Sequence, residues 1–247
     1  MAEGIGLIIG SGVAKLGLEI QARSPTKTPY GEPSSAVLRT RLGGSPVLCI
    51  LRHGESQRIP PHLVNYRANV WALREHGVSC CIAINAVGII EVSGFVPGAL
   101  AVPDQLIDYS WGREHTFDDG SSGPIRHAEF VEPFDPVLRG RIAAAATTTG
   151  RSTGRGVYGV TQGPRLETAA EIERMARDGC TMVGMTAMPE AALAREIGLR
   201  YAICAVGVNF AAGRDAEGIG VHAQLERYMG DGMAKARAML ERLMPEL

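Results

Sequence analysis

Short apolar runs, each bounded by glycine, proline or polar residues, recur along the whole chain. Most of these runs lack a strict apolar/polar alternation, which is typical of strands that are buried on both faces of a sheet. The pattern predicts strands within residues 4–10, 45–54, 80–88, 99–109, 155–163, 180–186 and 199–209.

Between several of these runs the apolar positions change to helical spacing. The pattern predicts helices within residues 60–77, 166–179, 188–198 and 221–244. The first two segments close on Gly77 and Gly179, as helices commonly do. Alternating strands and helices indicate one α/β domain over residues 1–247 with a largely buried sheet.

The middle of the chain departs from this pattern. From Asp108 to Pro136 it is rich in Gly, Asp and His and has no clear periodicity. A stretch of that length without secondary structure is uncommon inside a compact domain. We therefore consider it a candidate for a functional role or for a contact between subunits.

Composition excludes several classes of partner. The chain is 45% apolar and 21% charged with a net charge of −1, so nothing favours binding to nucleic acid or to an anionic membrane. No apolar run is long enough to span a bilayer, and the N-terminus lacks a basic signal-peptide region. No cysteine pair has metal-site spacing, and we expect no metal and a cytoplasmic protein with buried free thiols at Cys49, Cys80, Cys81, Cys180 and Cys204.

The first strand runs into Gly10-Ser11-Gly12, where backbone N–H groups could approach an anion. A dinucleotide-binding fingerprint would need glycine at position 15, which is Lys15 here. A plain tight turn explains these residues equally well.

Arg52 and His53 follow the second strand and could bind an oxyanion, or could be a surface arginine beside a structural histidine. Residues 85–86 and 185–186 end two further strands. Since ligands of open α/β sheets lie beyond the carboxyl ends of strands, these four ends could form one crevice.

Several longer blocks occur in a specific order: "GSG", "RHG", "PPHLVNYRANVWAL", "NAVG", "GVYGVTQGPRLETAAEI" and "VGMTAMPEAALAREIGLRYA". Together they resemble the trimeric purine nucleoside phosphorylase and methylthioadenosine phosphorylase family. When "DQLIDYSWGREHT" and "NFAAG" are included, the sequence is most similar to the bacterial methylthioinosine phosphorylase branch. The resemblance implies a central mixed, partly barrel-like β-sheet flanked by helices, and a homotrimer.

The resemblance also implies roles for individual residues. Met185 would lie against the ribose, His127 would reach the 5′ side of the sugar in a neighbouring subunit, and Glu167 and Asn209 would contact the purine. The middle segment would then help to complete the neighbour's site. No cofactor is implied, because inorganic phosphate is a co-substrate, and its ligands would be Ser11, Arg52, His53, Ala86 (through its backbone) and Thr186.

Asn209 ends the buried run 199–209, where by itself it could simply serve a turn or a cap. Family members that act on 6-aminopurines typically carry aspartate at the positions of Asn209 and Ala211. An amide can instead donate to the purine O6 and accept from N7–H, while Glu167 accepts from N1–H. We expect phosphorolysis of 6-oxopurine nucleosides. The alternatives are a 5′-methylthioadenosine phosphorylase and a non-catalytic purine-binding protein.

The group at the sugar 5′ position is left open. His222 lies close to where nucleoside-specific members carry a histidine for the 5′-hydroxyl, which favours inosine or guanosine, whereas the overall wording favours 5′-methylthioinosine. His222 could also cap the last helix. Two residues depart from the family pattern: Leu166 replaces a phenylalanine that packs on the base, and Gln57 replaces a histidine of the methylthioadenosine group.

Overall fold

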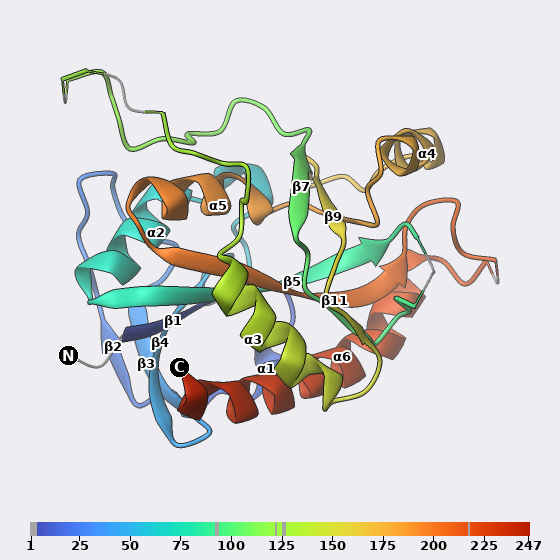
Figure 1. Ribbon diagram of the computed structural model, residues 1–247, viewed down its shortest axis with the longest axis horizontal. Coiled ribbons are helices and arrows are strands. Elements are labelled where there is room, and N and C mark those ends of the chain that lie inside the picture. Colours follow the sequence, from blue (N-terminus) through green and yellow to red (C-terminus); the bar gives the residue numbers. More distant parts are fainter. Residues whose placement is uncertain (1–3, 92–93, 122, 125–126, 217) are drawn as a thin grey trace.

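The computed structural model describes residues 4–91, 94–121, 123–124, 127–216 and 218–247. Helices cover both faces of one mixed sheet (Figure 1). The strands are β1 Gly4–Ile9, β2 Ala22–Ser24, β3 Val37–Leu42, β4 Ser45–Leu51, β5 Val78–Ile89, β6 Leu100–Ala101, β7 Gln105–Asp108, β8 Ser152–Thr153, β9 Val157–Val160, β10 Met182–Gly184 and β11 Arg200–Phe210. The helices are α1 Val13–Leu16, α2 Tyr66–Glu75, α3 Pro136–Thr147, α4 Ala169–Arg177, α5 Ala187–Glu196 and α6 Val221–Leu243, with 3₁₀ turns at Pro61–Leu63 and Met244–Glu246.

The sheet branches at β5. Its main path is β2-β3-β4-β1-β5-β10-β9-β7, while β11 pairs with both β5 and β6, and β6 pairs with β8. Strands β1, β4, β5 and β11 are mutually parallel along their pairings, whereas β10 runs antiparallel to β5. Because β5 has three partner strands, the sheet curls instead of continuing as one flat layer. The expected mixed α/β fold is confirmed.

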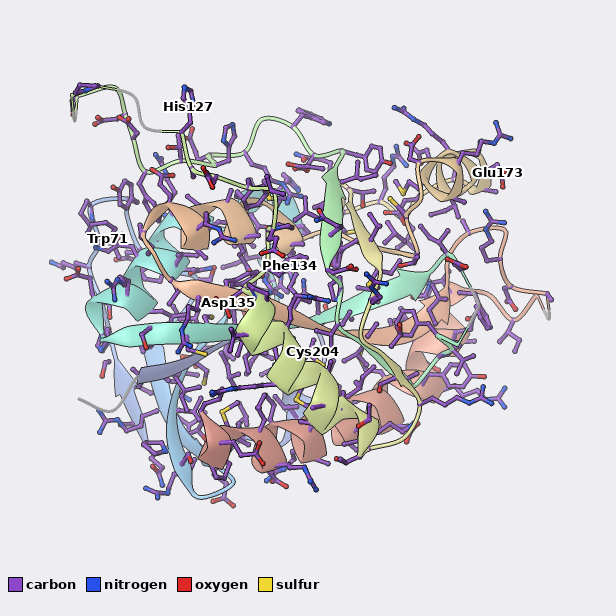
Figure 2. The ribbon with its side chains drawn as sticks, in the orientation of Figure 1. Trp71, His127, Phe134, Asp135, Glu173 and Cys204 are labelled. Carbon is purple, nitrogen blue, oxygen red and sulfur yellow. The ribbon has the colours of Figure 1, made fainter. Side chains whose placement is uncertain are left out.

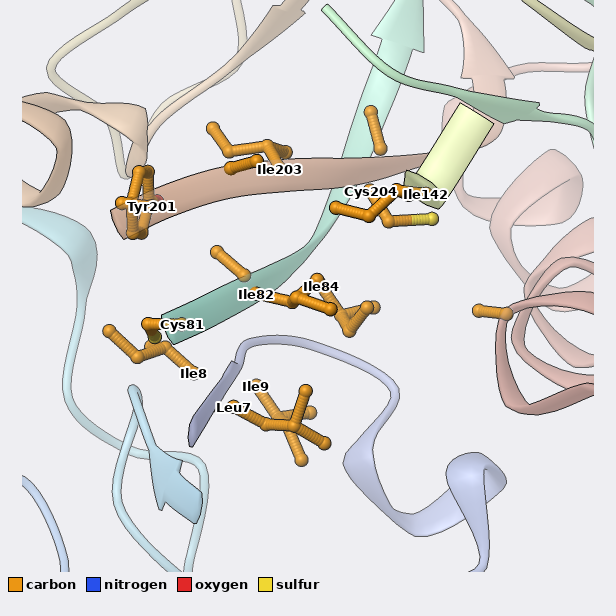
Figure 3. Packing of buried hydrophobic residues seen from close by; sticks show 14 of the residues in the cluster. Leu7, Ile8, Ile9, Cys81, Ile82, Ile84, Ile142, Tyr201, Ile203 and Cys204 are labelled. Carbon is orange, nitrogen blue, oxygen red and sulfur yellow. The ribbon is translucent and has the colours of Figure 1, made fainter. Parts of the chain in front are cut away.

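The strands are buried because helices cover both faces of the sheet. Helices α1, α3 and α6 lie on one face, and α2 and α5 lie on the other (Figure 1). Figure 3 shows part of the core, with apolar side chains on β1, β5 and β11 and with Ile142 of α3 beside Cys204. Helix α4 stands apart over β9 and β10, and its Ile172 and Met175 pack on Val183.

The sequence pattern located most strands but missed the short β2 and β8 and the six-residue β3. The predicted strand 99–109 divides into β6 and β7, with Pro103 between them. Helix α3 was not predicted, because its alanines form no apolar stripe. It begins where the Asp135 side chain accepts a hydrogen bond from the Leu138 N–H at 2.7 Å, with Pro136 at its first position.

All five cysteines are free and buried, as predicted. Burial raises the pKa of the Cys49 and Cys204 thiols to about 12, so both are protonated at neutral pH. Within the described ranges, none of the helices combines the length and apolar character needed to cross a membrane.

Replacing Ile82 tests the packing of the central strand. Ile82 of β5 is fully buried, so I82A should lower the free energy of unfolding by about 2–5 kcal/mol through lost contacts and a cavity. V131A is the control, because Val131 is 84% exposed and its truncation should change stability by less than about 0.5 kcal/mol. Urea unfolding at one fixed protein concentration measures both; equal effects would contradict the packing described here.

Candidate functional site

A cavity of about 360 Å³ lies where the carboxyl ends of β1 and β4 meet the middle of β5. Strand β10 runs back along the extension of β5 and so delivers residues 185–186 to residues 85–86. The four strand ends therefore converge as predicted, although one of them arrives antiparallel. The lining includes ten of the predicted residues: Ser11, Arg52, His53, Ala86, Leu166, Glu167, Met185, Thr186, Asn209 and Ala211.

The turn at Gly10-Ser11-Gly12 requires both of its glycines, one because a side chain approaches it closely and the other because its φ is positive. A Cβ on Gly10 would lie 2.6 Å from the Arg52 Nη1, and Gly12 has a φ of +87°. The Gly10 N–H donates to the Ile84 carbonyl at 3.3 Å. Glycine at position 10 thus lets the arginine lie directly against the turn that carries Ser11.

Arg52 is buried beneath the cavity, with only 1% of its side chain exposed, and is not a surface arginine. Its Nε and Nη2 donate to the two carboxylate oxygens of Glu190, which is fully buried, the Nη2 contact measuring 2.9 Å. Tyr201 donates to the same carboxylate at 2.9 Å. Burial alone would lower the pKa of Arg52, but the charge of Glu190 raises it above its usual range. Arg52 therefore stays cationic, with Nη1 directed at the turn.

Glu190 is a residue that sequence reasoning missed. A glutamate in the first turn of a helix is ordinary, since it complements the helix dipole, and "MPE" gives no sign of burial. The only signal would have been its place beside a predicted strand end that also carries Thr186.

Asn85 links the arginine to Thr186. Its Oδ1 accepts from the Arg52 Nη2 at 3.0 Å, and its Nδ2 donates to the Thr186 hydroxyl at 3.2 Å and to the Tyr158 hydroxyl at 3.3 Å. Because the Thr186 oxygen accepts from Asn85, its own proton is available to a ligand in the cavity. The Asn85 amide thus orients two donors toward one place.

His53 is held as one neutral tautomer. Its Nδ1 donates to the Ile59 carbonyl at 2.8 Å, since a carbonyl can only accept. Burial, and then the neighbouring Arg52 charge, lower the pKa of His53 below its ordinary 6.5. At neutral pH the ring therefore presents an Nε2 lone pair on the side of Gly10.

At the other end of the cavity, Asn209 is oriented by a β-bulge. The register between β11 and β5 shifts between Gly207 and Asn209, which redirects the side chain. The Asn209 Nδ2 donates to the Phe210 carbonyl at 2.8 Å, and Gly88 leaves room for the amide. The amide retains one N–H and its carbonyl oxygen for a ligand.

The remaining lining residues surround this amide. Glu167 is partly buried and accepts a hydrogen bond from the Thr161 hydroxyl at 2.5 Å. Ala211 is buried, whereas Leu166 is 48% exposed at the rim. Glu167 also lines a second cavity of about 470 Å³, together with Trp111 and Arg174.

Two predicted residues are not brought to the cavity of this chain. His222 is exposed on the first turn of α6, where Val221 and Leu225 face the cavity instead. The N-cap of α6 is Gly220 and has no side-chain cap bond, so His222 does not act as a cap either. His127 is exposed on the segment that projects between β7 and α3 (Figure 2). Its assignment to a neighbouring subunit's site stays a prediction.

The described residues form an α/β fold whose strand ends line a cavity large enough for a small ligand. Residues 4–244 match the model of the family described as "Phosphorylase superfamily", and the chain belongs to that family. The predicted family is thereby confirmed.

Individual relatives agree with this assignment. The chain is 46% identical over 240 residues to a Pseudomonas syringae pv. tomato protein named "Probable S-methyl-5'-thioinosine phosphorylase", covering 96% of this chain and 97% of the relative. It is 40% identical over 231 residues to a Pyrococcus furiosus "6-oxopurine nucleoside phosphorylase", covering 91% and 86%. A solved structure of methylthioadenosine phosphorylase from Schistosoma mansoni with adenine superposes with a TM-score of 0.91 at 30% identity, covering 99% of this chain and 91% of that one.

Removing the charge of Glu190 tests the buried pair. E190Q leaves the Arg52 guanidinium buried without a counter-charge and should lower the free energy of unfolding by about 3–5 kcal/mol. In the matched control E55Q, the exposed Arg23–Glu55 pair is lost and the change should stay below about 1 kcal/mol. Urea unfolding compares them, and an E190Q protein as stable as E55Q would show that the pair is not the constraint we describe.

Proposed function

We propose that this protein cleaves 6-oxopurine nucleosides with phosphate, giving the free base and a ribose 1-phosphate. The observation that carries the proposal is one cavity with anion donors (Ser11, Arg52, Thr186) at one end and the Asn209 amide at the other. A nucleoside between them would have its glycosidic bond between the phosphate and the base.

The chemistry needs these residue types. A phosphate oxygen forms a bond to C1′ of the sugar while the C1′–N9 bond breaks, and the electron pair leaves with the purine. The purine takes a proton at N7 from solvent, and hydrogen phosphate gives up its own proton as the ester forms, so the protons balance. The sugar becomes cationic and the base anionic in the transition state. Asn209 would accept from N7–H and donate to O6, so its hydrogen bonds strengthen as the base leaves.

The charges around the anion end support this mechanism. Arg52 carries +1 and Glu190 −1, and His53 is neutral at pH 7. The bound phosphate would therefore be held by hydrogen bonds without being neutralised, and its charge would remain available to the cationic sugar. We propose no metal or organic cofactor, with phosphate as co-substrate.

Base preference follows from hydrogen-bond complementarity. Ala211 offers no carboxylate, and the Asn209 amide suits an oxo group at purine C6. Glu167 can accept from N1–H, which adenine lacks. A methylthioadenosine phosphorylase remains the alternative, favoured by the structural similarity to the Schistosoma mansoni protein.

For the 5′ substituent we propose methylthio. Helix α6 presents only apolar side chains to the cavity, namely Val221, Leu225 and Met229, while His222 points elsewhere. Apolar lining suits a thioether better than a hydroxyl, which would lose hydrogen bonds with water. The bacterial relative with the methylthioinosine name supports the same choice.

We further propose a homotrimer in the cytoplasm, with sites completed across subunits. The exposed position of His127, away from its own cavity, is what such an arrangement requires (Figure 2). The buried free thiols suit a reducing compartment.

The deciding experiment is the initial rate of base release from 5′-methylthioinosine, inosine and 5′-methylthioadenosine, each with and without phosphate. We expect phosphate-dependent release, fastest from methylthioinosine. Faster turnover of inosine would indicate that His222 contacts the 5′-hydroxyl of the sugar. Faster turnover of methylthioadenosine would contradict the proposed role of Asn209. Nucleoside binding without phosphate-dependent release would indicate the non-catalytic alternative.

The Asn209 amide can be tested by N209D. A carboxylate cannot donate to O6, so kcat/KM for 6-oxopurine nucleosides should fall at least about 100-fold, and by much less for methylthioadenosine. Q21E is the control, because it makes the same amide-to-carboxylate change at an exposed residue that does not line the cavity. A uniform loss on all three nucleosides in N209D would contradict base reading by this amide.

The neutral His53 makes a pH-dependent prediction about anions. Its Nε2 lone pair can accept a hydrogen bond from the hydroxyl of hydrogen phosphate. Sulfate has no hydrogen to donate, so it can form a hydrogen bond with Nε2 only when the ring is protonated. Since the pKa of free His53 lies below 6.5, falling pH protonates it, and sulfate inhibition should strengthen from pH 8 to pH 5.5. Sulfate inhibition is measured in competition with phosphate. In H53Q, whose side chain does not titrate, the inhibition should not strengthen at low pH. Inhibition that does not depend on pH in the unaltered enzyme would contradict this role of His53.

A further inference from the structure

Arg113 belongs to the middle segment and reaches into the body of its own chain. Its Nη1 donates to the carbonyls of Met185 at 2.7 Å and Met188 at 2.6 Å. Its Nη2 donates to the carbonyls of Thr161 at 3.2 Å and Gln162 at 2.9 Å. One guanidinium thus joins two stretches of backbone that are distant in sequence.

These two stretches continue from the paired ends of β9 and β10, where the Thr161 N–H donates to the Gly184 carbonyl at 2.8 Å, and lead to different groups of the candidate site. Residues 185–188 contain Thr186, a donor at the anion end, and Met185, which also lines the cavity. Residues 161–162 lead through a turn to Glu167, which the Thr161 hydroxyl holds by a hydrogen bond. Arg113 itself does not line the cavity, so it can act on a ligand only through these backbones.

The guanidinium is fixed on its other side as well. It lies over the ring of Tyr66 at 5.5 Å from the centroid, and Nη1 is 3.4 Å from the Tyr66 hydroxyl. Tyr66 is buried in α2. A planar group with five donors can span four carbonyls while stacked on a ring, whereas a lysine ammonium cannot.

This arrangement of Arg113 has an energetic cost, which indicates that the side chain does more than fill space. Among the described residues, the buried Arg113 Nε has no hydrogen-bond partner, which is an unfavourable state for a charged donor. The adjoining segment is anchored separately: Phe117 packs on Tyr30 and Trp71, and its N–H donates to the Glu196 carboxylate at 3.0 Å. Holding the loop in place therefore does not depend on Arg113 alone.

We propose that Arg113 is a positioning residue that holds the turn leading to the base-contacting Glu167 and the phosphate-contacting residues 185–188 in a fixed arrangement beyond the paired ends of β9 and β10. This inference rests on the proposed phosphorolysis, in which phosphate must approach C1′ while the base is held at the far end. Each of the two stretches keeps its own ligand groups without Arg113. Its loss should therefore impair the reaction far more than the binding of either ligand alone.

The test compares R113Q with R139Q. Arg139 is a matched control, because it donates to the carbonyls of Pro103 and Gly154 at 2.8 Å each and lines no part of the cavity. For each protein, kcat is measured by phosphorolysis, and Kd for hypoxanthine and for inorganic phosphate is measured separately by calorimetry. Thermal unfolding monitors the fold.

We expect kcat of R113Q to fall at least about tenfold, with each separate Kd changing less than about threefold, while R139Q keeps its kcat. R113K should recover only part of the rate, since it keeps the charge but not the planar donors, and it serves if R113Q fails to fold. Added guanidinium ion should restore part of the rate in R113A and none in R139A.

The outcomes separate the two proposals. If the unaltered protein shows no phosphate-dependent cleavage, the proposed function fails and this inference fails with it. If the unaltered protein is active but R113Q and R113K match R139Q, or if kcat falls only in step with both Kd values, the inference alone is overturned.

Discussion

The buried contact between Arg52 and Glu190 is the constraint on which the rest of the site depends. A guanidinium taken out of water needs a counter-charge and partners for its remaining N–H groups. Glu190 supplies the charge from α5, and Asn85 of β5 accepts a further hydrogen bond. The Tyr201 hydroxyl of β11 donates a hydrogen bond to the Glu190 carboxylate. One ion pair thus fixes three elements, and the end of β4, against one another.

This pair also bears on the anion site that we propose. Because the two charges cancel and His53 is held neutral, an anion bound here would be held mainly by directed hydrogen bonds. Ser11, Thr186 and the Nη1 of Arg52 are donors of that kind. Such a site can select an anion by its protonation and shape, and leaves its charge available for chemistry on the neighbouring group.

The middle segment has two separate relations to the molecule. At its beginning, Arg113 and Phe117 anchor it on α2, on α5 and on the ends of β9 and β10 of its own chain. Further on, the segment projects away from the sheet and carries His127 into solvent (Figure 2). A loop anchored at one end and extended at the other suits the contact between subunits that we propose.

The sequence by itself determined much of this protein. Apolar runs located most strands, although not β3, helical spacing located α2, α4, α5 and α6, and the order of motifs identified the family. Ten of the predicted site residues line one cavity, because strand ends of an α/β sheet meet at a common edge whatever the details.

Only the tertiary structure decided the rest, because it depends on contacts between residues far apart in the chain. Nothing local to "MPE" shows that Glu190 is buried against Arg52, and nothing in "WGREHT" shows that Arg113 binds four backbone carbonyls. The direction of His222 was likewise hidden, since adjacent positions on a helix point about 100° apart and a shift of one residue puts Val221 at the cavity instead. Local pattern specifies which elements form; distances across the fold specify which side chains meet.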